Sequence, residues 1–297
     1  MINKIIYALI IIWVKIHALL PMPVLYRLSD IFFFLTYYLI RYRRKIVRAN
    51  IKNAFPDKTE KERSLLERRF YRHLSDYIVE TIKLAHISQE ELLKRAVIRN
   101  PEVVCNLMDR GHTTFIMVMG HYGNWEWFSG TATWFKGRTS IFQIYRPLSN
   151  SAFDRLFLNL RTRFHAFGIK KNEAFRDIIN LTRNKSQALV IFIADQTPSK
   201  ANLHYWTNFL NQETAFLTGP ERIAKKLDLP VIFADTQKTG RGHYAVDLRL
   251  ITEHAKNTPE YWITEQYARL MENCIQRDPA FWLWTHNRWK YKREHSI

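Results

Sequence analysis

Apolar and polar residues alternate along the chain in blocks whose lengths predict strands and helices in turn. Two apolar runs, Thr113 to Met119 and Ser186 to Ala194, have the length of buried strands. Strand-like runs also cover Thr139 to Tyr145, Leu229 to Thr236 and His243 to Ile251. Because segments with helical patterns separate several of these runs, the sequence predicts an α/β fold with a largely parallel central sheet flanked by helices.

Capping signals mark where several of the predicted helices begin. Thr59 to Glu62 has the spacing of a capping box and opens a long helix that we expect to reach about Leu84, and Ser88 to Glu91 opens a shorter one. Further helices are predicted over Ser151 to Phe167, Thr218 to Leu227 and Thr258 to Arg277. The aromatic stretch from Leu203 to Phe216 is expected to be irregular.

The first 50 residues contain the most apolar segments of the chain. The run from Ile2 to Leu20 is interrupted by Lys15 and His17, so its unbroken part is shorter than the ~20 residues that a membrane span needs. A second apolar stretch covers Val24 to Ile40. Two buried helices of a soluble domain are one interpretation. A signal peptide is another, but Pro21-Met22-Pro23 stands where a small-residue cleavage site would be expected.

Basic residues directly after these apolar segments favour a hydrophobic membrane-anchor helix. They are Arg41, Arg43, Arg44, Lys45 and Arg48. Lys and Arg beside an apolar helix favour the cytoplasmic side of a membrane and anionic lipid headgroups. We therefore divide the chain into an N-terminal membrane-anchor region with interfacial helices, residues 1–50, and a main domain that carries the chemistry, residues 51–297.

A strong positive charge constrains the partners. The 297 residues include 45 Lys and Arg against 27 Asp and Glu, a formal charge of +18, which attracts nucleic acid, anionic lipid, phosphorylated substrates or acidic proteins. No nucleic-acid recognition motif accompanies this charge, and the apolar N-terminal region argues against a nucleic-acid-binding protein. Cys105 and Cys274 form no spacing motif and are expected to be buried thiols in a reducing compartment.

The clearest chemical signal follows the first buried strand, in the segment GHYGNWEW. Four residues separate His121 from Glu126, so the two cannot share a face of one continuous helix. Gly120 and Gly123 allow a turn between them, because glycine tolerates backbone angles that other residues resist. A carboxylate held against the imidazole would fix its tautomer and raise its basicity, as a general base acting on a hydroxyl requires. A surface His–Glu pair without a catalytic role is the alternative.

This segment resembles the H-x4-D/E motif of the glycerolipid-type acyltransferases, and specifically that of the late (secondary) acyltransferases of lipid A biosynthesis, the lauroyl/myristoyl type. Three further segments resemble the same family. They are RYRRKIVRANIKNAFP in the basic N-terminal region, the Y-R-P-x-x-N turn that begins at Tyr145, and the W-x-H-x-R-W segment from Trp284 to Trp289.

The resemblance implies an enzyme that moves a fatty acyl chain from acyl carrier protein to a hydroxyl of a membrane-bound lipid A precursor. Acyl coenzyme A is a second donor to consider. The resemblance also implies a cell inner membrane location, with the catalytic domain on the cytoplasmic side. Acyl carrier protein, the lipid acceptor and the anionic membrane surface are the expected partners, and nucleic acid is not.

The resemblance further implies roles for single residues. Glu126 would orient His121, the general base, and Arg161 would belong to the active site, with Arg163 as the alternative arginine. Asp195 would position Arg161 or the substrate hydroxyl. We also expect Arg146 of the Y-R-P turn to bind substrate, and either backbone amides near Gly123 or Arg161 to stabilise the oxyanion.

Other interpretations stay open. The acceptor could be a different lipid, such as a lysophospholipid, a glycolipid or an aminolipid. A non-catalytic membrane scaffold that keeps the fold is disfavoured by the intact His121 and Glu126. A metal site on these two residues lacks a third ligand at a recognisable spacing, so we expect neither a metal nor a cofactor.

Overall fold

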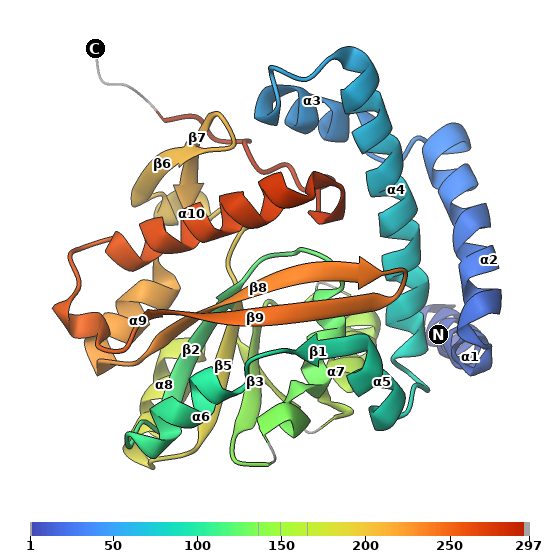
Figure 1. Cartoon of the computed structure of the whole chain (residues 1–297). Helices are drawn as coiled ribbons and strands as arrows, with labels where there is room; N and C mark the ends of the chain where they lie inside the picture. The colour runs from blue at the N-terminus through green and yellow to red at the C-terminus, as the bar shows by residue number, and fades with distance from the viewer. Residues whose placement is uncertain (1, 136, 149, 165, 294–297) are drawn as a thin grey trace.

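A seven-stranded, mostly parallel sheet forms the centre of the protein (Figure 1). The structure, a computed structural model, describes residues 2–135, 137–148, 150–164 and 166–293. The strand order is β1-β9-β8-β2-β5-β3-β4, and every neighbouring pair is parallel except β8 and β9. The strands are β1 Ala96–Ile98, β2 Thr114–Met119, β3 Ser140–Tyr145, β4 Ala166–Lys170, β5 Ala188–Ile193, β8 Val231–Gly240 and β9 His243–Thr252. The predicted α/β fold with a largely parallel sheet is confirmed.

Helices cover both faces of this sheet. They are α4 Glu60–Lys83, α5 Gln89–Arg95, α6 Glu102–Asp109, the 3₁₀ helix η2 Trp125–Phe135, α7 Ser151–Thr162, α8 Ala174–Arg183, α9 Gly219–Leu227 and α10 Trp262–Arg277. One buried apolar cluster includes residues of α8, α9 and α10, and a second includes residues of α6, η2 and α7. Along β2, Ile116 and Val118 belong to the first cluster and Phe115 and Met117 to the second, as the alternation of strand side chains requires. Since both faces are covered, β2 is an unbroken apolar run.

Three predicted elements differ from the structure. The helix predicted to reach Phe167 ends at Thr162, because the chain turns back to form the edge strand β4, which buries only Ala166 and Ile169 and so lacks a continuous apolar run. The stretch expected to be irregular forms an antiparallel hairpin, β6 Tyr205–Phe209 and β7 Gln212–Phe216. Its two turn residues have positive φ angles, which is the conformation of a tight hairpin turn. Finally, α10 begins at Trp262 rather than Thr258.

The N-terminal region packs on the main body. It contains α1 Ile2–Leu19, α2 Met22–Phe34, the short π-helix η1 Leu35–Leu39 and α3 Arg44–Ala54. Phe33, Tyr37 and Val47 belong to the same buried cluster as residues of α9 and α10. The boundary at residue 50 stays a prediction.

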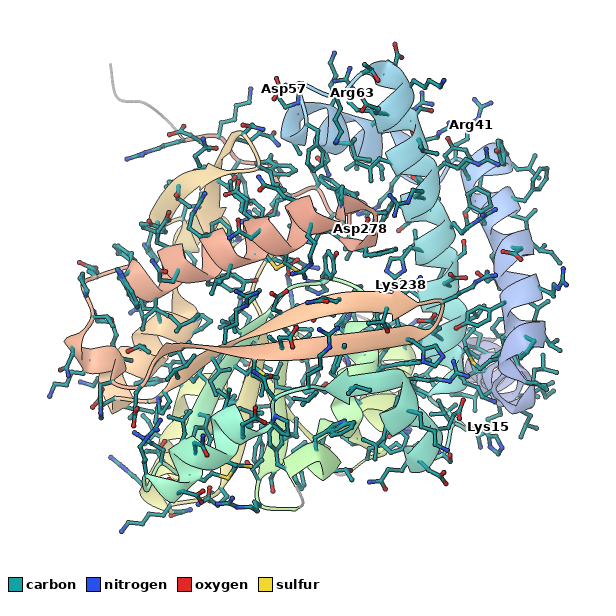
Figure 2. The ribbon with its side chains drawn as sticks, in the orientation of Figure 1. Lys15, Arg41, Asp57, Arg63, Lys238 and Asp278 are labelled. Carbon is teal, nitrogen blue, oxygen red and sulfur yellow. The ribbon has the colours of Figure 1, made fainter. Side chains whose placement is uncertain are left out.

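Buried charges on α4 connect these helices to the β8–β9 hairpin. Asp76 accepts hydrogen bonds from Ser29 of α2 and from Arg241 beyond β8, both at 2.7 Å. Lys238, near the end of β8, points toward α4, with its Nζ 3.6 Å from Oδ2 of Asp76 (Figure 2). Because these groups are paired across three elements, α2, α4 and the hairpin are fixed relative to one another.

The predicted membrane anchor is not confirmed. Among the helices whose residues are described, none is by itself both long and apolar enough to cross a membrane. The segments Met22–Leu39 and Arg44–Ala54 meet that test only as a pair, and they are bent by 87°. The N-terminal region does expose large apolar side chains, including Ile12, Trp13 and Ile16.

Candidate active site

The site begins where β2 ends. β2 pairs in parallel with β5 so that Met119 lies opposite Ile193, which brings the residues after the two strands, His121 and Asp195, together at one edge of the sheet. Nδ1 of His121 lies 2.6 Å from Oδ1 of Asp195, and the backbone N–H of His121 donates to Oδ2 at 2.9 Å. The imidazole is therefore fixed by a carboxylate from the neighbouring strand.

The environment of Asp195 keeps this carboxylate ionised. Burial by itself would raise the pKa of Asp195, but the charge and hydrogen bonds of His121 and the indole N–H of Trp282, which donates at 2.7 Å, outweigh it and lower the pKa to about 2. An ionised carboxylate can only accept, so in the neutral imidazole of His121 the proton is on Nδ1 and the lone pair is on Nε2. The side-chain nitrogen of Gln196 lies 3.3 Å from Nε2 and can donate to it. His121 thus has the tautomer of a general base.

The second carboxylate of the site is held by an arginine. Glu126 lies at the start of η2 and receives two hydrogen bonds from Arg161 of α7, from Nε at 2.7 Å and from Nη2 at 2.6 Å. Burial disfavours the charge of Arg161, but the hydrogen bonds and charge of Glu126 outweigh it and raise the pKa of the guanidinium. The side chain of Glu126 is only 3% exposed, whereas that of Arg161 is 25% exposed. Arg161 is therefore a permanent, fixed cation at the site.

The two carboxylates have partners that differ from those we expected. We assigned Glu126 to His121 and Asp195 to Arg161 or the substrate, but Asp195 holds Nδ1 of His121 and Glu126 holds Arg161. The physical reason is the parallel register of β2 and β5, which places Asp195 beside His121 without a turn. Of the two candidate arginines, Arg161 is the one that lines the site, since Arg163 donates to the carbonyl of Leu84 at 2.6 Å.

A large cavity opens in front of these groups. Its volume is about 1070 Å³, within or slightly above the range of pockets for small ligands. His121, Glu126, Arg161 and the predicted substrate residue Arg146 all line it, and so does Lys171. Much of the remaining lining is apolar or aromatic: Met119, Trp125, Phe128, Phe157, Leu158, Phe175, Phe192, Ile223 and Leu283. The cavity combines a base and cations with walls suited to a hydrocarbon chain.

Gly123 has a different place from the one we expected. Its φ angle is +64°, and its N–H donates to the carbonyl of Phe281 at 2.9 Å. Its own carbonyl lies 3.2 Å from Nε2 of the buried His73. Because the N–H is already engaged, Gly123 shapes the turn between His121 and Glu126 and does not offer a donor to an oxyanion.

The C-terminal segment contributes to the site in a way that we did not expect from the sequence. Besides the indole of Trp282, the backbone N–H of Leu283 donates to the carbonyl of His121 at 3.1 Å. His286 lies nearby, with Nε2 3.1 Å from the backbone N of Thr197, and its burial lowers its pKa to about 4. The sequence marked this segment by its aromatic residues and by the W-x-H-x-R-W resemblance, but neither signal gives the contact between Trp282 and Asp195.

Potential metal ligands do gather elsewhere. Among the described residues, ligand atoms of His112, Glu253 and His254 lie within 4.8 Å of one another. His112 precedes β2 whereas His121 follows it, so this group lies at the opposite end of the strand from the base. Arg110 also donates to the carboxylate of Glu253 at 3.0 Å.

The lowered pKa of Asp195 predicts a pH dependence of stability. A carboxyl group with a depressed pKa stabilises the fold above its unfolded pKa of 3.8 and loses this effect as the pH falls toward about 2. We expect wild-type protein to be more stable than Asp195→Asn at pH 6, and this advantage to shrink below about pH 4. Thermal unfolding of both proteins at stepped pH measures it. An advantage that stays constant down to pH 3 would contradict the assignment of the charge.

An imidazole oriented by a carboxylate and a fixed cation lie together at the carboxyl edge of a parallel sheet, an arrangement typical of enzyme active sites. The chain matches the family described as bacterial lipid A biosynthesis acyltransferase over residues 1–291. It therefore belongs to this family and is an acyltransferase, and the family supports acyl transfer to a lipid A-type acceptor. No curated protein matches the chain.

Proposed function

We propose that this acyltransferase is a late, lauroyl/myristoyl-type enzyme, which transfers a fatty acyl chain from the thioester of acyl carrier protein to a hydroxyl of a lipid A precursor. Acyl coenzyme A is the second donor to test. The apolar walls of the cavity suit the acyl chain, and the positive charge of the protein suits an acidic carrier protein and a phosphorylated lipid.

In the proposed reaction, Nε2 of His121 takes the proton of the acceptor hydroxyl while the hydroxyl oxygen attacks the thioester carbonyl. The tetrahedral intermediate then breaks its carbon–sulfur bond, and the leaving thiolate takes the proton from the imidazolium. Asp195 holds the tautomer that makes Nε2 the base and stabilises the imidazolium that forms. Glu126 takes no direct part in the proton transfer by His121. Its role in this scheme is to hold Arg161 in place. No metal, cofactor or covalent acyl-enzyme is required.

Arg161 is the group that we propose for the developing oxyanion. Its guanidinium lines the same cavity as His121 and is held in place by two hydrogen bonds to Glu126, so it needs no reorganisation during the reaction. Arg146, which follows β3, and Lys171, which follows β4, line the cavity as well, and we propose that they bind phosphate groups of the substrates.

We further propose that the protein works at the cytoplasmic face of the inner membrane. Exposed apolar side chains and basic residues occur together in the N-terminal region, which suits contact with an anionic lipid surface. They include Ile12, Trp13, Ile16, Leu19, Phe34, Leu39, Ile40, Arg41, Arg43 and Lys45.

The observation that supports the proposal most directly is the Asp195–His121 contact in a cavity large enough for an acyl chain. The experiment is a transfer assay with the purified full-length protein and labelled acyl carrier protein thioester. A phosphorylated lipid A precursor and a lysophospholipid are offered in parallel as acceptors, and labelled acyl coenzyme A as the second donor.

Label moving from the carrier protein to the lipid A precursor alone is the expected result. Label moving to the lysophospholipid instead would overturn the acceptor while leaving the base in place. A preference for acyl coenzyme A over the carrier protein thioester would overturn the donor.

A further inference from the structure

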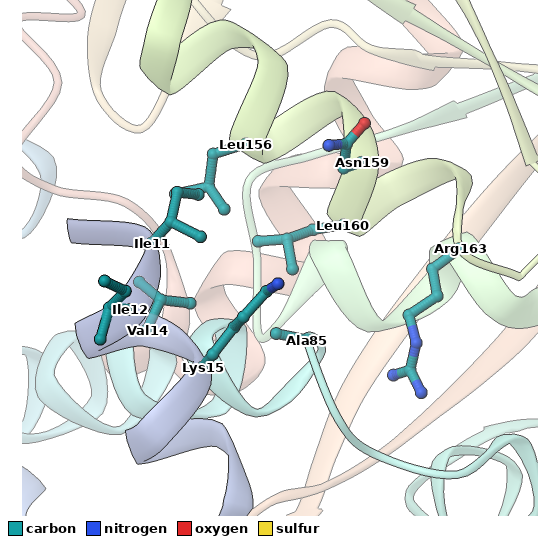
Figure 3. A pocket seen from close by; sticks show the side chains of 9 residues that line it. All are labelled: Ile11, Ile12, Val14, Lys15, Ala85, Leu156, Asn159, Leu160 and Arg163. Carbon is teal, nitrogen blue, oxygen red and sulfur yellow. The ribbon is translucent and has the colours of Figure 1, made fainter. Parts of the chain in front are cut away.

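A second cavity lies outside the active site, between α1 and α7. Its volume is about 500 Å³, and it is lined by Ile11, Ile12, Val14, Lys15, Ala85, Leu156, Asn159, Leu160 and Arg163 (Figure 3). We call it the α1–α7 groove. Six of these side chains are apolar, and the polar ones are Lys15, Asn159 and Arg163.

The charges at this groove are all of one sign. Lys15 and Arg163 are exposed, and no lining residue is acidic. Figure 3 shows Lys15 extending from α1 across the groove toward Leu160 and Ala85. Within the part of the chain that the structure describes, Lys15 has no ion pair, and Arg163 donates to a backbone carbonyl rather than to a carboxylate. An apolar lining beside the cation of Lys15, with no acidic residue in it, has the chemistry of a site for an anionic amphiphile.

The groove continues into the exposed apolar surface of α1. Ile12 lines the groove and is 53% exposed, and Trp13, Ile16 and Leu19 are exposed on the same helix. Within Ile10–Leu19, the part of α1 whose side chains the structure describes, Val14 and Ala18 are buried beside Ile82 of α4, and Lys83 donates to the carbonyls of Ala18 and Leu20. A molecule in the groove would therefore lie at the margin of a surface that suits a bilayer.

Helix α7 separates the groove from the active-site cavity. Asp154, Phe157, Leu158 and Arg161 line the catalytic cavity, whereas Leu156, Asn159, Leu160 and Arg163 line the groove. The helix that carries the active-site cation is thus open on its other side to the α1–α7 groove.

From these contacts we propose that the α1–α7 groove binds one anionic membrane lipid, with an acyl chain on the apolar floor and the phosphate at Lys15. The lipid would fill the space between α1 and α7 and hold the N-terminal helix to the wall of the active site. This site is distinct from the one where acyl transfer takes place, so it stands or falls separately from the proposed reaction.

The test is lipid retention by the full-length protein in neutral detergent, measured by native mass spectrometry without an acyl donor. Phosphatidylglycerol is compared with phosphatidylcholine for the wild type, Lys15→Gln, Leu156→Trp and Lys226→Gln. Lys226 is an exposed lysine on α9 and is the matched charge control. Thermal unfolding establishes that each variant is folded.

We expect the wild type to retain phosphatidylglycerol in preference to phosphatidylcholine. Lys15→Gln should weaken retention about fivefold, the effect of one lysine charge near an anionic surface, and Lys226→Gln should not. Leu156→Trp, which fills the groove, should reduce retention of both lipids. Three results would each overturn the site. The wild type could retain the two lipids equally, the two lysine variants could have equal effects, or folded Leu156→Trp could retain lipid fully.

Discussion

Replacing His121 by alanine is expected to lower acyl transfer by about 10²–10⁴-fold, the usual contribution of a positioned general base. Among the described residues, His121 is the only histidine that lines the catalytic cavity, and its imidazole is oriented by Asp195. The imidazole also pairs with the carboxylate of Asp195, which is only 2% exposed, so we expect the variant to be less stable than the wild type, and thermal unfolding establishes that it is folded. Initial rates with labelled acyl carrier protein thioester measure the effect.

An exposed histidine gives the matched control for this prediction. His254→Ala should retain the full transfer rate, because His254 lies beyond the far end of the sheet from His121. If His121→Ala kept a rate within a few-fold of the wild type while remaining folded, another group would have to be the base.

Arg161→Ala is expected to have the largest effect on stability. It leaves the carboxylate of Glu126, 3% exposed, without the two charge-assisted hydrogen bonds of the guanidinium. Removing one partner of a buried ion pair costs about 3–5 kcal/mol of unfolding free energy, and we expect the lower end because Arg161 is partly exposed. Transfer should fall as well, since the proposed oxyanion contact is lost. Denaturant unfolding and initial rates measure the two effects.

A double substitution separates the structural and catalytic effects of Arg161. Combining Arg161→Ala with Glu126→Gln also removes the buried negative charge of residue 126. The double variant should therefore recover part of the free energy of unfolding without recovering acyl transfer. Arg155→Ala, an exposed arginine on the same helix, is the matched control and should change neither quantity. Recovery of transfer in the double variant would mean that Arg161 serves only to neutralise Glu126.

The fold was largely predictable because its central strands are covered on both faces. β2 and β5 are unbroken apolar runs, and the cap of α4 forms the reciprocal Thr59–Glu62 hydrogen bonds that its sequence predicted. β4 and the β6–β7 hairpin were missed because their pattern is set by neighbours: β4 lies at a sheet edge, and the hairpin depends on two non-glycine residues with positive φ.

The members of the candidate site were easier to predict than their partners. His121, Glu126, Arg161 and Asp195 come together as expected, but which carboxylate contacts which cation depends on the register of β2 against β5. The register of two paired strands depends on both segments, which here lie far apart in the sequence. The local pattern of either segment therefore does not predict it. The same reason hid Trp282, whose indole becomes relevant only when the chain returns to the β2 loop.

The return of the C-terminal segment to the His121 loop also orders events during protein synthesis. More than half of the chain lies between His121 and Trp282, so the ribosome releases the loop long before the indole that supports Asp195 exists. The carbonyls and amides of Phe281 and Leu283 that hold the loop arrive at the same late stage. Until Trp282 and Leu283 have been synthesised, a nascent chain therefore has His121 and Asp195 but lacks the contacts that support them.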